Sequence, residues 1–331
     1  MAELAGVSSA TVSRVLNANY PVATETRARV LHAVQTLNYE LNAHARALTT
    51  ASSDMVGVVV HDVSDPYFSE IIRGVQQVAD EAGRLIMICN SLRDASRELA
   101  YVRVLRRQRA DAVILVGGAI GDEAYEEKLT SHMQGLEASN SRLIVCGRSR
   151  AGTASVNAQH AAGAEALTRR LLDLGHRRLA FIAGPAHVGT SRNRFRGFKR
   201  ALATAGITPE PTLMAQGDFS RDGGYEAARR LLRGGERFTA LVGSNDLMAI
   251  GAMTALRESG LEIPGDVSVV GFDDIPVARD VTPALTTVRV PMRLMGARAM
   301  ELALQSDGRS RAAINLRTEI VERESMGAPG S

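Results

Sequence analysis

The sequence predicts an α/β protein that begins with a small all-helical unit. From Met55 onward, short apolar runs of strand length alternate with longer segments of helical periodicity, a pattern typical of a parallel sheet covered by helices on both faces. Residues 1–50 instead contain short helical segments separated by turn residues. The 331 residues, 45% of them apolar and 23% charged, suffice for two or three globular domains.

The N-terminal unit is predicted to contain a helix, a tight turn and a second helix. Gly6 is suited to the left-handed conformation that ends a helix. Ser8 is suited to cap the next helix, over residues 9–17, in which Val12 and Val15 fall on one face. This is the pattern of a helix-turn-helix.

A third helix is predicted over residues 25–39, with Thr24 as its N-cap. Its apolar residues Val30, Val34 and Leu37 recur at helical spacing. We therefore expect a three-helix mini-core, which is too small to be robust by itself.

A short conditional helix is predicted to follow. Asn42 is suited to cap residues 43–50, and the polar stretch 51–54 ends the pattern. We therefore place a helical headpiece at 1–41, a short hinge helix with a linker at 42–53, and the α/β domain at 54–331.

The α/β domain is predicted to form two doubly wound lobes of similar size. The expected strands are residues 55–61, 84–90, 110–117, 142–147, 176–184, 240–246, 267–274 and 314–323. The expected helices are residues 67–83, 96–108, 122–137, 161–175, 191–206, 224–234, 247–260 and the closing region 289–305. Ligands of open α/β sheets bind at the carboxyl ends of strands, so residues just after the strands are the candidates for a site between the lobes.

Several classes of protein are disfavoured. There is no apolar run of 18 residues and no basic segment followed by an apolar stretch at the N-terminus, so we expect neither a membrane span nor a secretory signal and place the protein in the cytoplasm. The sequence lacks G-x-S-x-G, H-E-x-x-H and G-x-x-x-x-G-K-[ST], and Lys128 and Lys199 are its only lysines. We therefore expect no enzyme, no catalytic residue, no cofactor and no metal site.

Eight segments together resemble one family of bacterial regulators. They are GVSSATVSRVLN, VATETRARVLHAVQTLNYELNAHARAL, VGVVVHDVSDPYFSEIIRGV, LGHRRLAFIAGP, RFRGFKRAL, SNDLMAIGAM, IPGDVSVVGFDD and PALTTVRVP. In this order they resemble the lac repressor and galactose repressor family, from Ala2 to about Arg323. A collinear resemblance of this length is far more specific than any single motif.

The resemblance implies a helix-turn-helix headpiece joined to a two-lobed sensor domain like that of periplasmic binding proteins. It implies a sequence-specific transcription regulator, most plausibly a repressor, that binds operator DNA as a homodimer. Hinge helices would fold in the minor groove, and a small, sugar-like effector would bind between the sensor lobes and alter the affinity for DNA.

The resemblance also implies the residues that contact DNA. Base-reading positions fall on Ser9, Ala10 and Arg14, and Arg14 is the sharpest candidate because arginine reads guanine bidentately. Contacts to the phosphate backbone are expected from Ser8, Thr11, Ser13 and Asn17. Leu48 would wedge between base steps, with Ala45 and Arg46 along the minor groove. The alternatives are a solvated polar helix face and a Leu48 that packs on the sensor domain.

For the effector, the family positions fall on polar and aromatic side chains. Arg194, Asn245 and Asp273 make a set that binds hydroxyl groups. Tyr67, Phe68 and Phe219 would supply flat apolar walls. The strand-end loops add His61, Asp65 and Arg148 as further candidates. The alternatives are a surface salt bridge for Arg194, core packing for the two phenylalanines, and a helix N-cap for Asp273.

Three features depart from the family pattern. Met1 falls inside the expected first helix, so the headpiece looks clipped. Gln159 and His160 stand where an Asp-Asn pair is common between the lobes. No C-terminal heptad segment follows, so a tetrameric coiled coil has no basis in the sequence. The rival hypothesis is a sugar-binding sensor or transport component without a DNA function.

Overall fold

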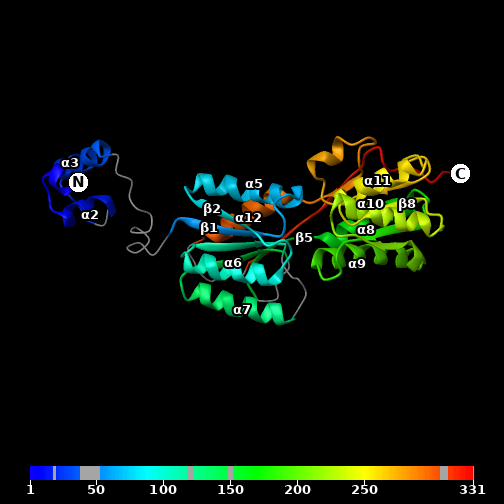
Figure 1. Cartoon of the computed structure of the whole chain (residues 1–331), viewed down its shortest axis with the longest axis horizontal. Helices are drawn as coiled ribbons and strands as arrows, with labels where there is room; N and C mark the ends of the chain where they lie inside the picture. Colours follow the sequence, from blue (N-terminus) through cyan, green and yellow to red (C-terminus); the bar gives the residue numbers. More distant parts are fainter. Residues whose placement is uncertain (18–19, 38–52, 118–122, 148–151, 306–311, 331) are drawn as a thin grey trace. The chain divides into compact units, whose positions relative to one another are not determined.

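The computed structural model describes residues 1–17, 20–37, 53–117, 123–147, 152–305 and 312–330. The chain divides into two compact units, Met1–Ser53 and Asp54–Ser331 (Figure 1). No helix in these described ranges combines the length and the apolarity required to cross a bilayer.

The N-terminal unit contains the predicted helix-turn-helix. The helices are α1 (Ala2–Ala5), α2 (Ser9–Asn17) and α3 (Thr24–Thr36). Gly6 ends α1 in the left-handed conformation, with φ of 61°. The Ser8 hydroxyl accepts a hydrogen bond from the Thr11 N–H at 3.2 Å, which satisfies a donor at the start of α2. Both predicted caps are confirmed.

The third helix differs from the prediction at both ends. Its N-cap is Ala23, which makes no side-chain bond, and Thr24 is already helical, so the prediction of a Thr24 cap was wrong. Leu37 lies just beyond the last turn and is 49% exposed. The prediction that Leu37 faces the mini-core was therefore wrong, and Ala33 packs there instead. The mini-core consists of Ala5, Val12, Val15, Val30 and Ala33.

The first lobe of the larger unit is a six-stranded parallel sheet in the order β11-β5-β4-β3-β1-β2. The strands are β1 (Met55–Val60), β2 (Leu85–Asn90), β3 (Ala112–Val116), β4 (Arg142–Cys146), β5 (Ala154–Ala158) and β11 (Ala313–Leu316). Its helices are α5 (Pro66–Glu81), α6 (Ala95–Arg107), α7 (Glu123–Glu137) and α12 (Met292–Leu304). Figure 1 shows α5 and α12 on one face of the sheet and α6 and α7 on the other.

The apolar run of β1 serves both faces, because successive side chains of a strand point to opposite sides. Val58 joins the core beneath α5 and α12, whereas Val59 joins the core beneath α6 and α7. This explains why the sequence of β1 reads as continuously apolar and not as alternating.

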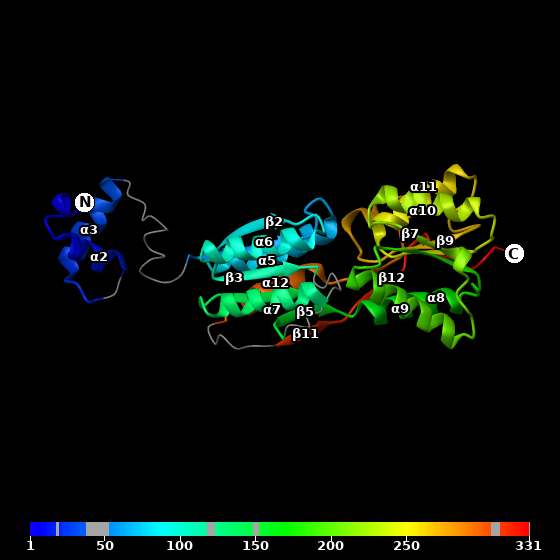
Figure 2. The same cartoon turned by 60° about the horizontal axis from the view of Figure 1, so that its bottom comes forward.

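The second lobe has a four-stranded parallel sheet in the order β7-β6-β8-β9. The strands are β6 (Leu179–Ala183), β7 (Met214–Gln216), β8 (Ala240–Gly243) and β9 (Ser268–Val270). The helices are α8 (His160–Asp173), α9 (Gly189–Thr204), α10 (Arg221–Arg233) and α11 (Asp246–Glu258). Figure 2 shows the α8–α9 pair and the α10–α11 pair on opposite sides of this sheet. The prediction of two doubly wound lobes is confirmed.

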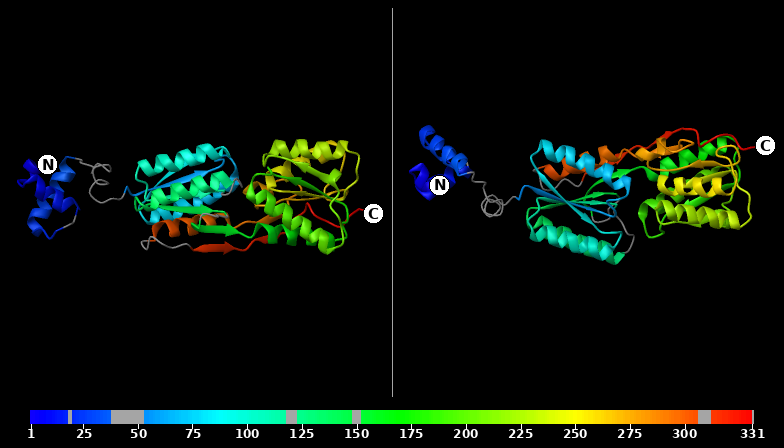
Figure 3. Two further views of the ribbon diagram at one scale, coloured as in Figure 1. Left: turned by 90° about the horizontal axis from the view of Figure 1, so that it is seen from below. Right: turned by 45° about the horizontal axis from the view of Figure 1, so that its top comes forward.

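Three described segments connect the lobes. The chain passes from β5 into α8, returns from β10 (Thr287–Arg289) into α12, and passes from β11 to β12 (Glu319–Val321), which pairs antiparallel with β10 (Figure 3). The sequence pattern does not predict β5, because ASVNA is short and carries only one branched apolar residue. It is nevertheless the strand from which the chain first leaves the first lobe.

The paired helices approach through glycines. A Cβ atom added at Gly74 of α5 would lie 1.9 Å from the Arg293 carbonyl oxygen of α12, and one at Gly296 of α12 would lie 1.9 Å from the Ile71 carbonyl oxygen. These two backbones therefore touch directly, and a side chain on either residue would force them apart.

We expect Gly74→Ala to destabilise the larger unit by about 1–3 kcal/mol, because its methyl group meets fixed backbone. Gly135→Ala in α7 is the matched control, since a Cβ there meets only the movable guanidinium of Arg106 and the helix gains about 0.5–1 kcal/mol from the loss of glycine. Urea denaturation of both variants measures the difference. Equal stability of the two would contradict close backbone packing between α5 and α12.

Candidate functional site

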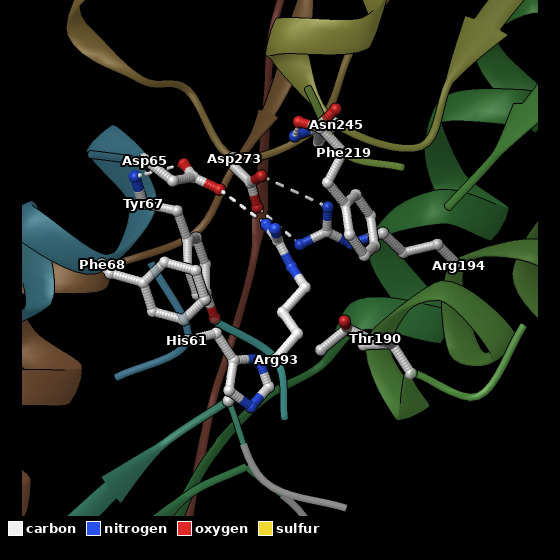
Figure 4. Close-up of a pocket in the computed structure, with 12 residues that line it drawn as sticks. His61, Asp65, Tyr67, Phe68, Arg93, Thr190, Arg194, Phe219, Asn245 and Asp273 are labelled. Carbon is white, nitrogen blue, oxygen red and sulfur yellow. Dashed lines mark hydrogen bonds and ion pairs between the residues drawn. The ribbon is translucent and has the colours of Figure 1, made fainter. Parts of the chain in front are cut away.

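A pocket lies between the two lobes, at the carboxyl ends of β1, β6 and β8 (Figure 4). It brings together eight predicted side chains: His61, Asp65, Tyr67, Phe68, Arg194, Phe219, Asn245 and Asp273. It also contains four residues that the analysis of the sequence did not single out: Arg93, Gly117, Val188 and Thr190. Both lobes therefore contribute to one site, as expected for residues that follow parallel strands.

A buried ion pair forms the polar centre of the pocket. The Arg194 guanidinium, on α9, donates from Nη2 to Asp273 Oδ1 at 2.5 Å and from Nη1 to Asp273 Oδ2 at 3.3 Å. The Arg194 side chain is 4% exposed and that of Asp273 is 5% exposed, so Arg194 is not in a surface salt bridge. Asp273 does not cap a helix either, because its carboxylate faces the guanidinium.

The second lobe holds the Arg194 guanidinium on several sides. Nη1 also donates to the Ser244 carbonyl at 2.5 Å, Nη2 lies 3.4 Å from His160 Nδ1, and the group stacks 4.0 Å from the Phe272 ring centroid. Burial, together with the charge of Arg194, holds the pKa of His160 well below its usual value. His160 is therefore neutral and accepts from Arg194, so the departure at this position supplies a partner for the central arginine.

The loop that carries Asp273 has a strained backbone that hydrogen bonds hold in place. Asp273 and Asp274 have φ of 119° and 60°, values that side-chain-bearing residues seldom adopt. Asp246, at the start of α11, accepts from the Ile275 N–H at 2.8 Å and from the Thr287 hydroxyl at 2.5 Å. Burial raises the pKa of Asp246 to about 6, and these two hydrogen bonds oppose the rise. Asp246 thereby holds the loop that aims Asp273 at Arg194.

Burial also raises the pKa of Asp273 above its usual value, and the adjacent charge of Arg194 opposes the rise. Desolvation of the carboxylate is the largest cause. The carboxylate consequently depends on its guanidinium partner to stay charged, and the two side chains act as one unit.

Three aromatic rings form the apolar walls. Tyr67 and Phe68, in the first turn of α5, meet edge to face with centroids 5.1 Å apart. Phe219 faces them from the second lobe, with φ of 74° (Figure 4). These rings are buried against their own lobes and line the pocket at the same time. Core packing and contact with a ligand are therefore compatible roles for them.

Asn245 supports Phe219. Its Oδ1 caps α11 by accepting from the Met248 N–H at 3.0 Å, and its Nδ2 donates to the Phe219 carbonyl at 2.9 Å. The amide lines the pocket, and these bonds leave it one N–H and one lone pair of Oδ1 for a ligand.

His61 and Asp65 lie on the first-lobe side. Asp65 caps α5 by accepting from the Tyr67 N–H at 3.0 Å. Burial raises the pKa of Asp65, while that hydrogen bond and the charge of Arg93 oppose the rise. His61 Nε2 lies 3.4 Å from Glu98 Oε2, and the Tyr125 hydroxyl donates to the other Glu98 oxygen. The Glu98 carboxylate therefore lies close to the imidazole of His61 without forming a hydrogen bond to its Nε2.

The pocket retains unsatisfied polar groups. Arg194 Nε and His61 Nε2, on two side chains that line the pocket, are buried without a hydrogen-bond partner among the described residues. Buried polar atoms are nearly always bonded, so these two atoms are available to water or to a ligand. A guanidinium, carboxylates and an amide between aromatic walls form a set that binds hydroxyl groups.

Arg93 was missed although a signal was present. It follows β2 by three residues, so the same strand-end rule that singled out the other loops would have included it. Thr190 lies in the first turn of α9, close before Arg194. Gly117 and Val188 have no chemistry of their own and could not be found from the sequence.

In the N-terminal unit, one face of α2 is open. Ser9, Ala10, Ser13 and Arg14 are exposed, while Val12 and Val15 face the mini-core. Ser8 and Thr11 lie at the helix start, where their hydroxyl groups are 3.0 Å apart. The side chain of Asn17 and residues Ala45, Arg46, Leu48 and Arg148 lie outside the described residues.

Because buried charges are costly when unpaired, we expect Asp273→Asn to destabilise the larger unit by about 3–5 kcal/mol. The double variant Arg194→Met with Asp273→Asn removes both charges and is expected to recover most of this loss. Urea denaturation measures the free energy of unfolding of the wild type, both single variants and the double variant, which together form a double-mutant cycle. Additive losses in the double variant would show that the pair is not coupled.

Comparison with known proteins matches this architecture. Residues 1–42 match the model of bacterial regulatory proteins of the lacI family, and residues 168–326 match the periplasmic binding protein-like domain. The transcriptional regulator GalR of Escherichia coli K12 is 37% identical over 333 residues, which cover 99% of this chain and 95% of GalR.

Two solved structures are also similar over nearly their whole length. The lac repressor dimer bound to operator and the anti-inducer ONPF has a TM-score of 0.87 at 29% identity, covering 99% of this chain and 98% of that one. The complex of the transcriptional regulator CelR with cellobiose has a TM-score of 0.73 at 31% identity, covering 98% of each chain. The chain therefore belongs to the lacI family of bacterial regulatory proteins: it is a DNA-binding transcriptional regulator, not an enzyme, with a helix-turn-helix headpiece and a periplasmic-binding-protein-like sensor domain.

Proposed function

We propose that this regulator represses transcription by binding a near-palindromic operator as a homodimer, and that a neutral, hydroxyl-rich effector between the sensor lobes controls its affinity for DNA. The observation that carries the proposal is the interlobe pocket, where a buried Arg194–Asp273 pair lies between aromatic walls. A hydroxyl group both donates and accepts, so it satisfies a carboxylate and a guanidinium together.

The exposed face of α2 supports base reading in the major groove. We propose that Arg14 contacts guanine and that Ser9 and Ala10 make short contacts to base edges, because their side chains are small. Ser8, Thr11, Ser13 and Asn17 would contact the phosphate backbone. Ala45, Arg46 and the wedge residue Leu48 remain proposals from the resemblance. A regulator that reads chromosomal DNA acts in the cytoplasm.

The homodimer is supported by an apolar edge. β2 is the last strand of its sheet, and its Leu85, Met87 and Ile88 are exposed. Soluble proteins rarely leave an apolar edge strand uncovered. The lac repressor structure similar to this chain is a dimer, and two paired headpieces would account for a near-palindromic operator.

The effector proposal rests on chemistry and on similar proteins. The CelR structure contains cellobiose, a neutral sugar. In this chain His61, Asp65, Tyr67, Phe68, Arg194, Phe219, Asn245 and Asp273 line the pocket, and we propose them, with Arg148, as the effector-binding residues.

Removal of Arg14 is expected to weaken operator binding by about 1–3 kcal/mol per half-site, since a bidentate contact to a base is lost. The measurement is gel-shift titration of Arg14→Ala against DNA from upstream of the chain's own gene neighbourhood and against shuffled DNA, at two salt concentrations. Arg27→Ala, which removes the same charge from α3, is the control. Only Arg14→Ala should lower the ratio of specific to nonspecific affinity. An equal loss of affinity in both variants would indicate that Arg14 contacts phosphate and not a base. If neither the variants nor the wild type bind DNA, the result would favour a sensor without a DNA function.

A panel of neutral sugars that includes cellobiose and D-ribose is expected to contain a compound that raises the melting temperature of the wild type. Binding at a hundredfold excess over Kd stabilises the folded state by about 2.7 kcal/mol. The double variant Arg194→Met with Asp273→Asn keeps the pocket but lacks the charged pair, so the same compound should leave its melting temperature unchanged. An equal shift in both proteins would place the sugar elsewhere.

A further inference from the structure

A side chain of the protein itself fills the interlobe pocket. Arg93 projects from the turn between β2 and α6 and runs between the Phe68 and Phe219 rings (Figure 4). With Arg93 in this position, the cavity has a volume of about 30 Å³, which admits only a few water molecules. Pockets that bind small molecules usually measure about 300–1,000 Å³. A sugar therefore has no room until a group moves.

The backbone of the turn is firmly held at both ends. Ser91 is fully buried and bonds the Val60 carbonyl with its N–H at 2.9 Å and its hydroxyl at 3.1 Å. Asp94 caps α6 by accepting from the N–H groups of Ser96 and Arg97 at 2.8 and 3.1 Å. Between these anchors Arg93 has φ of 60°. The side chain of Arg93 is therefore the part that can move, and not the loop.

The Arg93 guanidinium is held loosely. Nη2 lies 3.7 Å from Asp65 Oδ2 and Nη1 lies 3.9 Å from Asp62 Oδ2, both longer than a hydrogen bond. Its side chain is 24% exposed, whereas that of Arg194 on the other side of the pocket is 4% exposed and bonds its carboxylate at 2.5 Å. Of the two arginines, Arg93 is the one that a ligand can displace.

Arg93 also spans the two lobes. It belongs to the first lobe, and its guanidinium carbon lies 5.8 Å from the ring centroid of Phe219 in the second lobe. A cation at this distance is attracted to the face of the ring. The contact therefore joins the lobes through the position that a flat ligand would take between the aromatic walls.

The charges around Arg93 indicate what can replace it. Arg194 and Asp273 neutralise each other, whereas the single charge of Arg93 faces the two carboxylates of Asp62 and Asp65. When Arg93 swings into water, the two carboxylates of the first lobe remain. They accept hydrogen bonds from hydroxyl groups and repel an anionic group.

We propose that Arg93 is a specificity-determining residue that occupies the effector position in the empty pocket and links the two lobes through Phe219. The effector must displace Arg93, and this requirement selects neutral, hydroxyl-rich ligands over anionic ones. This inference rests on the proposed effector site.

The first test needs no effector. Arg93→Gly suits the backbone, because glycine adopts φ of 60° without strain. Hydrogen exchange of the backbone around Phe219, on the second lobe, is expected to quicken by about fivefold, as for the loss of one weak ion pair and one cation–π contact. Millimolar methylguanidinium should restore slow exchange, because it can bind where the Arg93 guanidinium lies in the wild type. Arg97→Ala removes the same charge from the first turn of α6, where Arg97 pairs with Asp94, and should leave the exchange around Phe219 unchanged.

Unchanged exchange around Phe219 in Arg93→Gly, or no effect of methylguanidinium, overturns the proposed link between the lobes. Exchange that quickens equally in Arg97→Ala overturns it too, since the effect would then follow from lost charge alone.

The second test compares ligands. Calorimetric titration with cellobiose, D-glucose and D-ribose, and with the anionic D-glucuronate and glucose 6-phosphate, is carried out on wild type and Arg93→Gly. The neutral sugar that binds is expected to bind Arg93→Gly about fivefold more tightly, and the anionic sugars to bind both proteins more weakly. Weaker binding of the neutral sugar by the variant, or preference of the wild type for an anionic sugar, would make Arg93 a direct ligand contact and overturn the proposal. If no sugar binds either protein, the proposed sugar site fails, while hydrogen exchange still decides the role of Arg93.

Discussion

The buried pair of Arg194 and Asp273 is the interaction on which the sensor domain is organised. It joins α9 to the loop after β9, and the same guanidinium reaches the end of β8 and the start of α8. A charge in this position is tolerated only because each neighbour supplies a partner. The neutral His160, the Phe272 ring and the Ser244 carbonyl are therefore parts of one site, although they come from three different segments of the chain.

The same pair explains why the adjoining loop tolerates strain. Asp273 aims its carboxylate at Arg194 only from a left-handed backbone, and Asp246 and Thr287 hold that backbone in place. Strain of this kind persists where surrounding contacts over-determine it, and it is concentrated at sites that bind or switch. Lobe movement that disturbs the loop would thus disturb the carboxylate directly, which gives the pocket a physical connection to the packing of the second lobe.

The headpiece has a different construction. Its core comprises five small or branched residues, too few to make a robust domain. One side of its helix α2 is exposed to solvent. That side lies outside the mini-core, and it carries the residues that we propose to contact DNA.

Periodicity and turn residues in the sequence determined most of the architecture. Gly6 and Ser8 act through their own backbone and hydroxyl groups, so their caps were predictable. The strand-end rule brought six of the eight predicted side chains to one pocket because parallel strands end at one edge, whereas Arg194 and Phe219 were predicted only from the family resemblance. Only the tertiary structure decided the rest. Leu37 is exposed just beyond α3, which ends at Thr36 and not at Tyr39 as predicted. ASVNA became a strand because its neighbours pair with it, and His160 became a partner of Arg194 because two distant segments meet. Arg93 fills the pocket for the same reason: which side chain occupies a cleft depends on the distance and charge of groups far away in the chain, and a local pattern carries no information about them.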